Sequence, residues 1–345
     1  MQEGAATLNQ NLQGKTAYSV IVDTHIHLYD PHRPEGAPWP EPDDQIYLTT
    51  LPDRCIALAR PAGVDGAIVV ECSEWVEDNQ WILDLADEEP FLLGLVGNLD
   101  VHDDRFSENL DRFAKHPVFR GIRARLRKPD DLDGLRQLAD LDLSLDSGVN
   151  DLTAIIATEI PELRIIINHC AGIKMEGDEP DQAAIDQMRR AAEYPNVFCK
   201  LSGMMDLRCT IRPAPTDIDH YAPYLDLIWD AFGEERMIFG SDWPVSDRSD
   251  RSYADVFKLA QDYVATKPAS AKRRSFLLTH VELTNGRIAN GKPLSGSAGR
   301  YRWHISRSCH RLFADRPSRA RCSHGRLSGI DRPVRQAVPR RADVS

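Results

Sequence analysis

The sequence predicts an α/β fold, a (β/α)8 TIM barrel, on three observations. Short apolar or β-branched runs alternate with amphipathic stretches along most of the chain, which is typical of a parallel sheet with helical crossovers. Eight such runs occur within about 250 residues, the length of a closed eight-stranded barrel. Polar residues suited to bind a metal or a substrate recur where the runs end, and a barrel gathers these ends at one face.

The predicted strands follow one another at regular intervals. They are Val20–His27, Gly66–Cys72, Leu92–Asn98, Phe119–Ala124, Leu141–Asp146, Leu163–Cys170, Asn196–Ser202 and Met237–Trp243. Helical patterns lie between them, for example at Asp78–Glu89, Phe106–His116, Asp151–Glu159, Ala183–Tyr194 and Tyr221–Phe232. The alternative is an open doubly wound sheet, but no glycine-rich phosphate-binding turn follows the first run.

The first predicted strand ends in a His-x-His pair. Side chains alternate faces along a strand, so His25 and His27 project the same way, about 7 Å apart along the chain. Two imidazoles directed together at a strand end are suited to bind one divalent metal ion, zinc first and manganese second. The proline-rich loop that follows carries Trp39, which we expect to contact substrate at the rim of the barrel.

Charged residues close the second, fourth and seventh strands. Glu71 is a further candidate metal ligand; the alternatives are a hydrogen-bonding partner of a ligand histidine and an ion-paired barrel residue. Arg123 ends the fourth strand, Arg125 leaves on the same face, and Lys200 ends the seventh. We expect these three cations to bind a substrate carboxylate or to stabilise an oxyanion, which favours an anionic substrate.

The sixth and eighth strands end in His169 and Asp242. Together with the His-x-His pair and Glu71, these two residues form the expected ligand set for one divalent cation. Such a cation lowers the pKa of a bound water toward neutrality. Asp242 is the expected base that accepts the proton of this water, and His169 is the second expected catalytic residue. The structural alternatives are a helix cap for Asp242 and a hydrogen-bonded core position for His169.

Length, charge and cysteine content narrow the class of protein. The chain has 345 residues, 42% of them hydrophobic, which is enough for a large core. It has no apolar run of membrane-spanning length, and Met1–Lys15 is too polar for a secretory signal. Seven cysteines without regular spacing suit reduced thiols, so we expect a cytoplasmic protein.

Composition divides the chain into an N-terminal extension (residues 1–18), a barrel (19–290) and a tail (291–345). The first 290 residues hold 29 basic and 50 acidic residues, which argues against nucleic-acid binding. The tail holds 13 basic and 3 acidic residues without apolar periodicity, so we expect it to be disordered. It is either a basic arm that binds nucleic acid or an acidic partner, or the product of a shifted reading frame.

Five motifs occur in order along the predicted barrel. They are His25-Ile26-His27, Gly121-Ile122-Arg123, Asn168-His169-Cys170-Ala171-Gly172, Lys200-Leu201-Ser202-Gly203 and Gly240-Ser241-Asp242-Trp243-Pro244. With them, the chain resembles the amidohydrolase-related (amidohydrolase 2) family, and within it the branch of sugar-lactone and 2-pyrone-4,6-dicarboxylate lactonases. The resemblance runs from about Val20 to about Val264 and implies a distorted TIM barrel that hydrolyses a small lactone or a related ester.

The resemblance also implies roles for individual residues. It makes His25, His27 and His169 metal-binding or substrate-polarising groups and Asp242 the residue that activates water, and it places Arg123 and Lys200 at substrate. Members of this group differ in their need for a metal, so a metal-independent mechanism stays open.

The chain departs from the family pattern at two places. At the fifth strand end Asp146 stands where some metal-dependent amidohydrolases have a histidine, which argues against a binuclear site. The family also ends in a helix that carries an asparagine, which Phe276–Ile288 with Asn285 matches poorly.

Three functions fit these observations. The first is a hydrolase that opens a small anionic lactone with an activated water. The second is a metal-dependent non-oxidative decarboxylase, which release of carbon dioxide would distinguish. The third is an inactive product with a disrupted C-terminus. The expected partner is a small-molecule substrate, and the sequence leaves open whether the chain forms a homo-oligomer.

Overall fold

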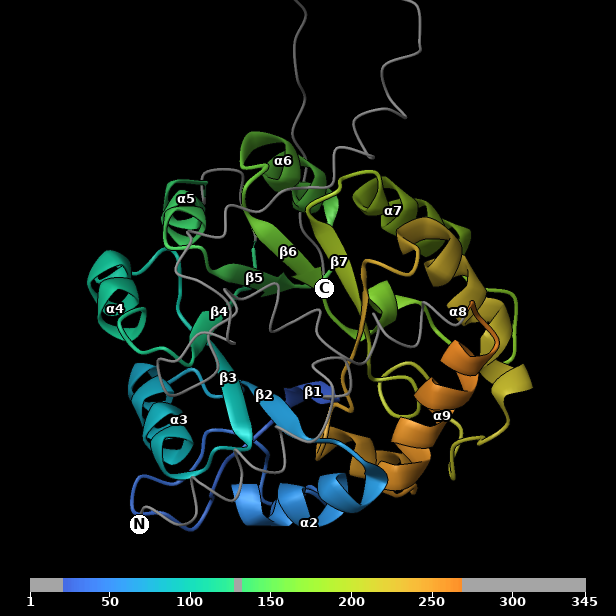
Figure 1. Cartoon of the computed structure of the whole chain (residues 1–345), viewed down its shortest axis with the longest axis horizontal. Coiled ribbons are helices and arrows are strands. Elements are labelled where there is room, and N and C mark those ends of the chain that lie inside the picture. The colour runs from blue at the N-terminus through green and yellow to red at the C-terminus, as the bar shows by residue number, and fades with distance from the viewer. Residues whose placement is uncertain (1–20, 127–131, 269–345) are drawn as a thin grey trace, which may run out of the picture. The chain divides into compact units, whose positions relative to one another are not determined.

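Eight parallel strands form one sheet whose order follows the chain from β1 to β8. The structure is a computed structural model that describes residues 21–126 and 132–268. The strands are β1 (Val22–Ile26), β2 (Gly66–Val70), β3 (Leu92–Gly97), β4 (Phe119–Arg123), β5 (Ser144–Ser147), β6 (Arg164–Ile167), β7 (Val197–Leu201) and β8 (Met237–Phe239). Figure 1 shows them arranged in a ring. The predicted eight-stranded TIM barrel is therefore confirmed.

One α-helix follows each strand and covers the outside of the ring (Figure 1). The helices are α2 (Pro52–Ala62), α3 (Val76–Glu88), α4 (Phe106–Phe113), α5 (Leu132–Asp140), α6 (Asp151–Glu159), α7 (Gln182–Ala192), α8 (Ile218–Phe232) and α9 (Tyr253–Ala265). The five predicted helices match within three residues at each end. Helices α2, α5 and α9 were not among them. Within the described ranges, no helix has both the length and the apolar character needed to cross a membrane.

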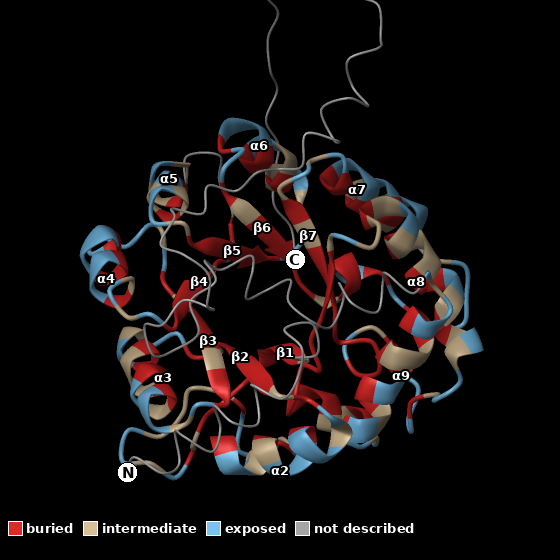
Figure 2. Ribbon diagram, in the orientation of Figure 1, coloured by how far each residue is buried: buried red, intermediate tan, exposed pale blue. Residues whose placement is uncertain are grey.

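The strands are buried on both faces, while the helices expose their outer faces (Figure 2). Along β2, Ala67 and Val69 belong to the main core, which the strands form with the helices. Ile68 and Val70 belong to a separate cluster with Val96 of β3. Because successive side chains alternate faces, this second cluster fills the inside of the barrel.

The barrel closes between β1 and β8, and this closure forms the site described below. Ile26 pairs with Trp243, and the His27 N–H donates to the Trp243 carbonyl over 2.8 Å. The buried Asp23 carboxylate accepts hydrogen bonds from the Ser241 amide at 2.8 Å and the Tyr253 hydroxyl at 2.9 Å. These contacts hold the ends of β1 and β8 together, although they lie more than 200 residues apart in the sequence.

Three predicted features lie outside the described residues. They are the extension 1–18, the tail 291–345 and the Phe276–Ile288 helix with Asn285. The domain boundaries at 18 and 290 therefore stay predictions.

Candidate active site

Asp242 lies in a turn beyond the end of β8, although the sequence predicted a strand that continues through Trp243. The strand ends at Phe239, and Asp242 has a left-handed backbone with φ of +62°. Its N–H donates to the His25 carbonyl over 2.8 Å. A left-handed residue with a Cβ costs about 1–2 kcal/mol, and such strain is typical of functional sites. The turn places the Asp242 carboxyl beside the first strand.

His169 also lies in a left-handed turn. The sequence predicted a strand at this position. Strand β6 ends at Ile167, and the short 3-10 segment η2 (His169–Gly172) follows, with φ of +50° at His169. Its N–H donates to Ser202 Oγ over 3.2 Å, and the same Oγ lies 3.1 Å from His169 Nδ1. A Cβ at Gly203 would lie 3.0 Å from this nitrogen, so the glycine leaves room for the imidazole.

Three histidines surround the Asp242 carboxyl group. Oδ1 lies 3.4 Å from His25 Nε2 and 3.2 Å from His27 Nε2, and Oδ2 lies 3.8 Å from His169 Nδ1. Burial raises the pKa of Asp242 to about 7. Burial lowers the pKa of His27 to about 3 and holds the pKa values of His25 and His169 well below their usual range. The site therefore combines neutral imidazoles with a carboxyl group that titrates near neutral pH.

A second carboxyl group, Asp206, interacts with Asp242 and is not among the residues predicted from the sequence. Asp206 is 7% exposed and stands in the connection between β7 and α8. Burial raises its pKa well above the usual range, and the neighbouring Asp242 raises it further. No motif or strand end marks Asp206 in the sequence, so only the folded chain reveals it.

Lys200 lies beneath the histidines, inside the barrel. Its Nζ is 2.5 Å from Asp146 Oδ2 and 3.5 Å from His25 Nδ1, and Lys200 and Asp146 are both fully buried. Burial lowers the pKa of Lys200, whereas the Asp146 carboxylate raises it. In the structure the ammonium group of Lys200 contacts Asp146 and His25. Its predicted contact with substrate stays a prediction.

Glu71 occupies a turn at the end of β2. Its Oε1 accepts hydrogen bonds from the amides of Cys72 at 2.7 Å and Ser73 at 2.8 Å, while the buried Oε2 has no hydrogen-bond partner. Burial raises the pKa of Glu71 to about 7. Its role as a metal ligand stays a prediction.

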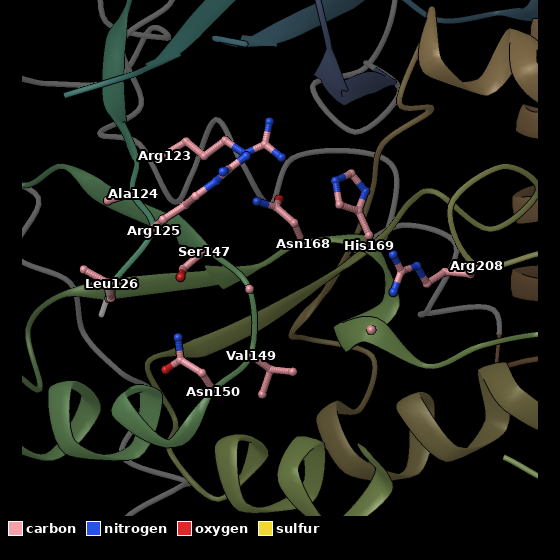
Figure 3. A pocket seen from close by; sticks show the side chains of 12 residues that line it. Arg123, Ala124, Arg125, Leu126, Ser147, Val149, Asn150, Asn168, His169 and Arg208 are labelled. Carbon is pink, nitrogen blue, oxygen red and sulfur yellow. The ribbon is translucent and has the colours of Figure 1, made fainter. Parts of the chain in front are cut away.

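A pocket of about 400 Å³ opens beside His169 (Figure 3). Arg123 and Arg125 extend over it from the end of β4, and the guanidinium group of Arg208 faces His169 from the other side. Asn168 also lines the pocket, with a buried Oδ1 that has no hydrogen-bond partner. Among the described residues that line the pocket, none is acidic. Arg123 and Arg125 are predicted from the sequence, whereas Arg208 is not, because it lies within the connection between β7 and α8 and not at a strand end.

Trp39 lies apart from this pocket. Its ring contacts the edge of the His27 ring, with centroids 5.9 Å apart, and the Arg248 guanidinium lies 5.7 Å from the Trp39 ring. The indole therefore covers the His-x-His side of the site, and its contact with substrate stays a prediction.

Three donor groups of the site lie close enough together to surround one divalent cation. His25, His169 and Asp242 offer ligand atoms that all lie within 4.8 Å of one another. Two of these atoms, His25 Nε2 and Asp242 Oδ2, are buried without a hydrogen-bond partner. Imidazole nitrogens and a carboxylate oxygen are the ligands of catalytic zinc sites. His27 stands outside this group, although its Nε2 approaches Asp242 Oδ1.

The fold and the site together define an enzyme of the barrel type, with histidines and an aspartate at the carboxyl ends of its strands. Comparisons with known proteins also indicate an enzyme. A family model described as amidohydrolase matches residues 22–279. The L-fucono-1,5-lactonase of Burkholderia ambifaria is 31% identical over 238 residues, which cover 65% of this chain and 80% of that protein. The L-fucono-1,5-lactonase of Burkholderia multivorans is 25% identical over 275 residues, or 73% of this chain and 91% of that protein.

Solved structures show the same fold. A zinc-bound amidohydrolase from Burkholderia multivorans superposes with a TM-score of 0.66 at 23% identity, covering 77% of this chain and 99% of that one. A structure from Pseudomonas putida, described as a 2-pyrone-4,6-dicarboxylic acid hydrolase, has a TM-score of 0.60 at 19% identity, covering 77% and 97%. The chain belongs to the amidohydrolase family. It is a lactonase-like hydrolase of that family.

Proposed function

We propose that this enzyme opens a small lactone that carries a carboxylate group. The names of two curated relatives, both L-fucono-1,5-lactonases, support a lactone as substrate. An anionic substrate is supported by the pocket beside His169, which Arg123, Arg125 and Arg208 line and where no described lining residue is acidic. Arginine binds carboxylates with two parallel hydrogen bonds, so this pocket suits a carboxylate on the lactone ring.

Asp242 is the base in the proposed reaction. Its carboxylate accepts a proton from the attacking water, whose oxygen forms a bond with the lactone carbonyl carbon. The ring C–O bond then breaks, and protonated Asp242 returns the proton to the leaving oxygen. The products on one open chain are a hydroxyl group and a carboxylic acid, which releases its proton to solvent and becomes a carboxylate. A base with a pKa of about 7 suits this exchange at neutral pH.

A divalent cation fits this site beside Asp242, and zinc is the proposed ion because a zinc-bound relative has the same fold. Such an ion would polarise the carbonyl and lower the pKa of the water. The residues of the chain still hold the substrate, since the arginine pocket orients the carboxylate and His169 lies between that pocket and Asp242.

The test compares an anionic lactone, 2-pyrone-4,6-dicarboxylate, with the neutral L-fucono-1,5-lactone. We expect the anionic lactone to have the higher kcat/KM. Arg125→Met and Arg208→Met should each raise its KM by about 10-fold or more, because a charge-assisted hydrogen bond contributes about 1.5–3 kcal/mol. Arg136→Met is the matched control, since Arg136 pairs with Asp133 at the surface and should leave KM unchanged.

Two outcomes contradict the proposal. A preference for the neutral lactone, together with arginine variants that behave like the control, would show that the substrate is not anionic. Release of carbon dioxide from a carboxylated substrate without ring opening would identify a decarboxylase instead.

A further inference from the structure

The buried Lys200–Asp146 pair restricts the hydrogen bonding of His25. An ammonium group has three donors and no acceptor, and Lys200 Nζ lies 3.5 Å from His25 Nδ1. An N–H on Nδ1 would face another N–H, so Nδ1 has to act as the acceptor. A neutral imidazole carries one proton, which then stands on Nε2. Asp146 keeps the ammonium in place, because its Oδ2 lies 2.5 Å from Nζ and both side chains are fully buried.

His27 is held in the opposite tautomer. Its Nδ1 lies 2.7 Å from the Val70 carbonyl oxygen, which accepts hydrogen bonds and cannot donate them. The proton of His27 therefore stands on Nδ1, and its Nε2 is the acceptor in the hydrogen bond with Asp242 Oδ1 at 3.2 Å, which the protonated carboxyl group donates. The Nε2 atom of His25 lies 3.4 Å from the same oxygen. The two histidines thus present different groups to one carboxyl oxygen.

This difference matters for metal binding. A ligand histidine binds the metal through a nitrogen lone pair and usually donates its other N–H to a carbonyl or carboxylate. His27 fits this pattern, with Val70 as the acceptor. His25 does not, because a donor faces its second nitrogen. The short distances would make His25 a metal ligand together with His169 and Asp242. The hydrogen-bond donor at its Nδ1 indicates that it is not one.

We propose that Lys200, held by Asp146, is a positioning residue that fixes the proton of His25 on Nε2 and so makes His25 a hydrogen-bond donor instead of a zinc ligand. The inference concerns the site of the proposed function, but it does not depend on which substrate the enzyme hydrolyses. It also predicts that the wild-type chain binds zinc more weakly than the number of nearby donor atoms suggests.

The first experiment reads the tautomer directly. Full-length protein labelled with 15N-histidine is studied by NMR without metal and after addition of one equivalent of zinc, and His25→Gln assigns the resonances. We expect a pyrrole-like Nε2 and a pyridine-like Nδ1 for His25 in both samples, and the reverse for His27 without metal. A proton on Nδ1 of His25, or loss of the Nε2 proton when zinc is added, would overturn the proposal.

The second experiment replaces the donor with an acceptor. In Lys200→Gln/Asp146→Asn, the glutamine carbonyl can accept an Nδ1–H, which frees the Nε2 lone pair of His25. We expect zinc affinity, measured by competition with a chelating dye, to rise about 10- to 100-fold, because the hydrogen-bond partner of a ligand histidine changes metal affinity by about this factor. The matched control is Arg164→Gln/Asp142→Asn, which removes an ion pair at the opposite end of the barrel and should leave affinity unchanged.

Unchanged or weaker zinc binding in a folded Lys200→Gln/Asp146→Asn variant contradicts the proposal. If that variant does not fold, the NMR spectrum of the wild-type protein still tests the tautomer of His25, because it needs no substitution at Lys200. Neither readout uses a lactone, so failure of the proposed function would leave both results interpretable.

Discussion

At the scale of single residues, the surroundings of Asp242 determine its chemistry. Burial raises its pKa to about 7, and its backbone is held in a left-handed turn against β1. Asp247 lies five residues further on and pairs with Arg54 at 3.4 Å. The two aspartates are close in sequence, yet only Asp242 contacts the histidines described above.

Replacement of Asp242 tests its role as the base. Asp242→Asn keeps the side-chain volume and removes the proton acceptor, so we expect kcat to fall by about 100- to 10,000-fold, the usual contribution of a general base. The melting temperature should stay at or above the wild-type value, because no buried charge is created. Asp247→Asn is the control and should keep nearly full activity. A rate close to wild type in Asp242→Asn would show that another group activates water.

The pH dependence of the reaction follows from the same pKa. Asp242 has to be deprotonated to accept a proton, so kcat/KM should fall tenfold per pH unit below about 7 and level off above it. His27, with its pKa lowered to about 3, stays neutral across this range and causes no second change in the pH profile. The measurement is kcat/KM between about pH 5 and pH 9. A midpoint near the ordinary carboxyl pKa of about 4 would show that burial does not keep the pKa of Asp242 raised in the working enzyme.

At the scale of elements, the meeting of β1 and β8 creates the site. Gly240 follows the end of β8 and packs closely against His25, since a Cβ there would come within 2.5 Å of His25 Cβ and 3.1 Å of its backbone nitrogen. The close approach explains why a residue without a side chain precedes the turn that carries Asp242.

Gly240→Ala should therefore loosen the closure of the barrel. We expect the free energy of unfolding to fall by about 1–3 kcal/mol, the usual cost of overpacking, and kcat/KM to fall because His25 is displaced. Urea denaturation measures the stability. Gly148→Ala serves as the control for stability alone, since no atom lies within 4 Å of a Cβ built there but Gly148 lines the pocket beside His169. Equal stability of the two variants would mean that the strands can separate without cost.

At the scale of the whole molecule, the described site uses residues between β1 and the turn after β8. The basic segment from Gly291 onward contributes none of the site residues described here. A chain that ends at Asn290 keeps every site residue described here, so we expect it to retain kcat/KM within about twofold. Activity and solubility measured beside the full chain provide the check. Loss of both would show that the segment after Asn290 supports the barrel.

Much of the barrel could be predicted from the sequence, because apolar periodicity is a local property. The His-x-His pair, Arg123, His169, Lys200 and Asp242 were all found as polar residues at the ends of predicted strands. The left-handed turns at His169 and Asp242 could not be foreseen, since their N–H groups donate to acceptors that are distant in the sequence. Asp206 and Arg208 were missed for a related reason: they lie in a connection that carries no periodic signal.

The sequence by itself determined the order of strands and helices, the family and the positions of the histidines, because these depend on short motifs and on spacing along the chain. The tertiary structure alone decided which polar groups meet. The pairing of Lys200 with Asp146, the opposite hydrogen bonding of His25 and His27, and the arginine pocket beside His169 all arise from closure of the barrel. Closure brings together side chains that are distant in sequence, and hydrogen bonds and ion pairs depend on that distance in space.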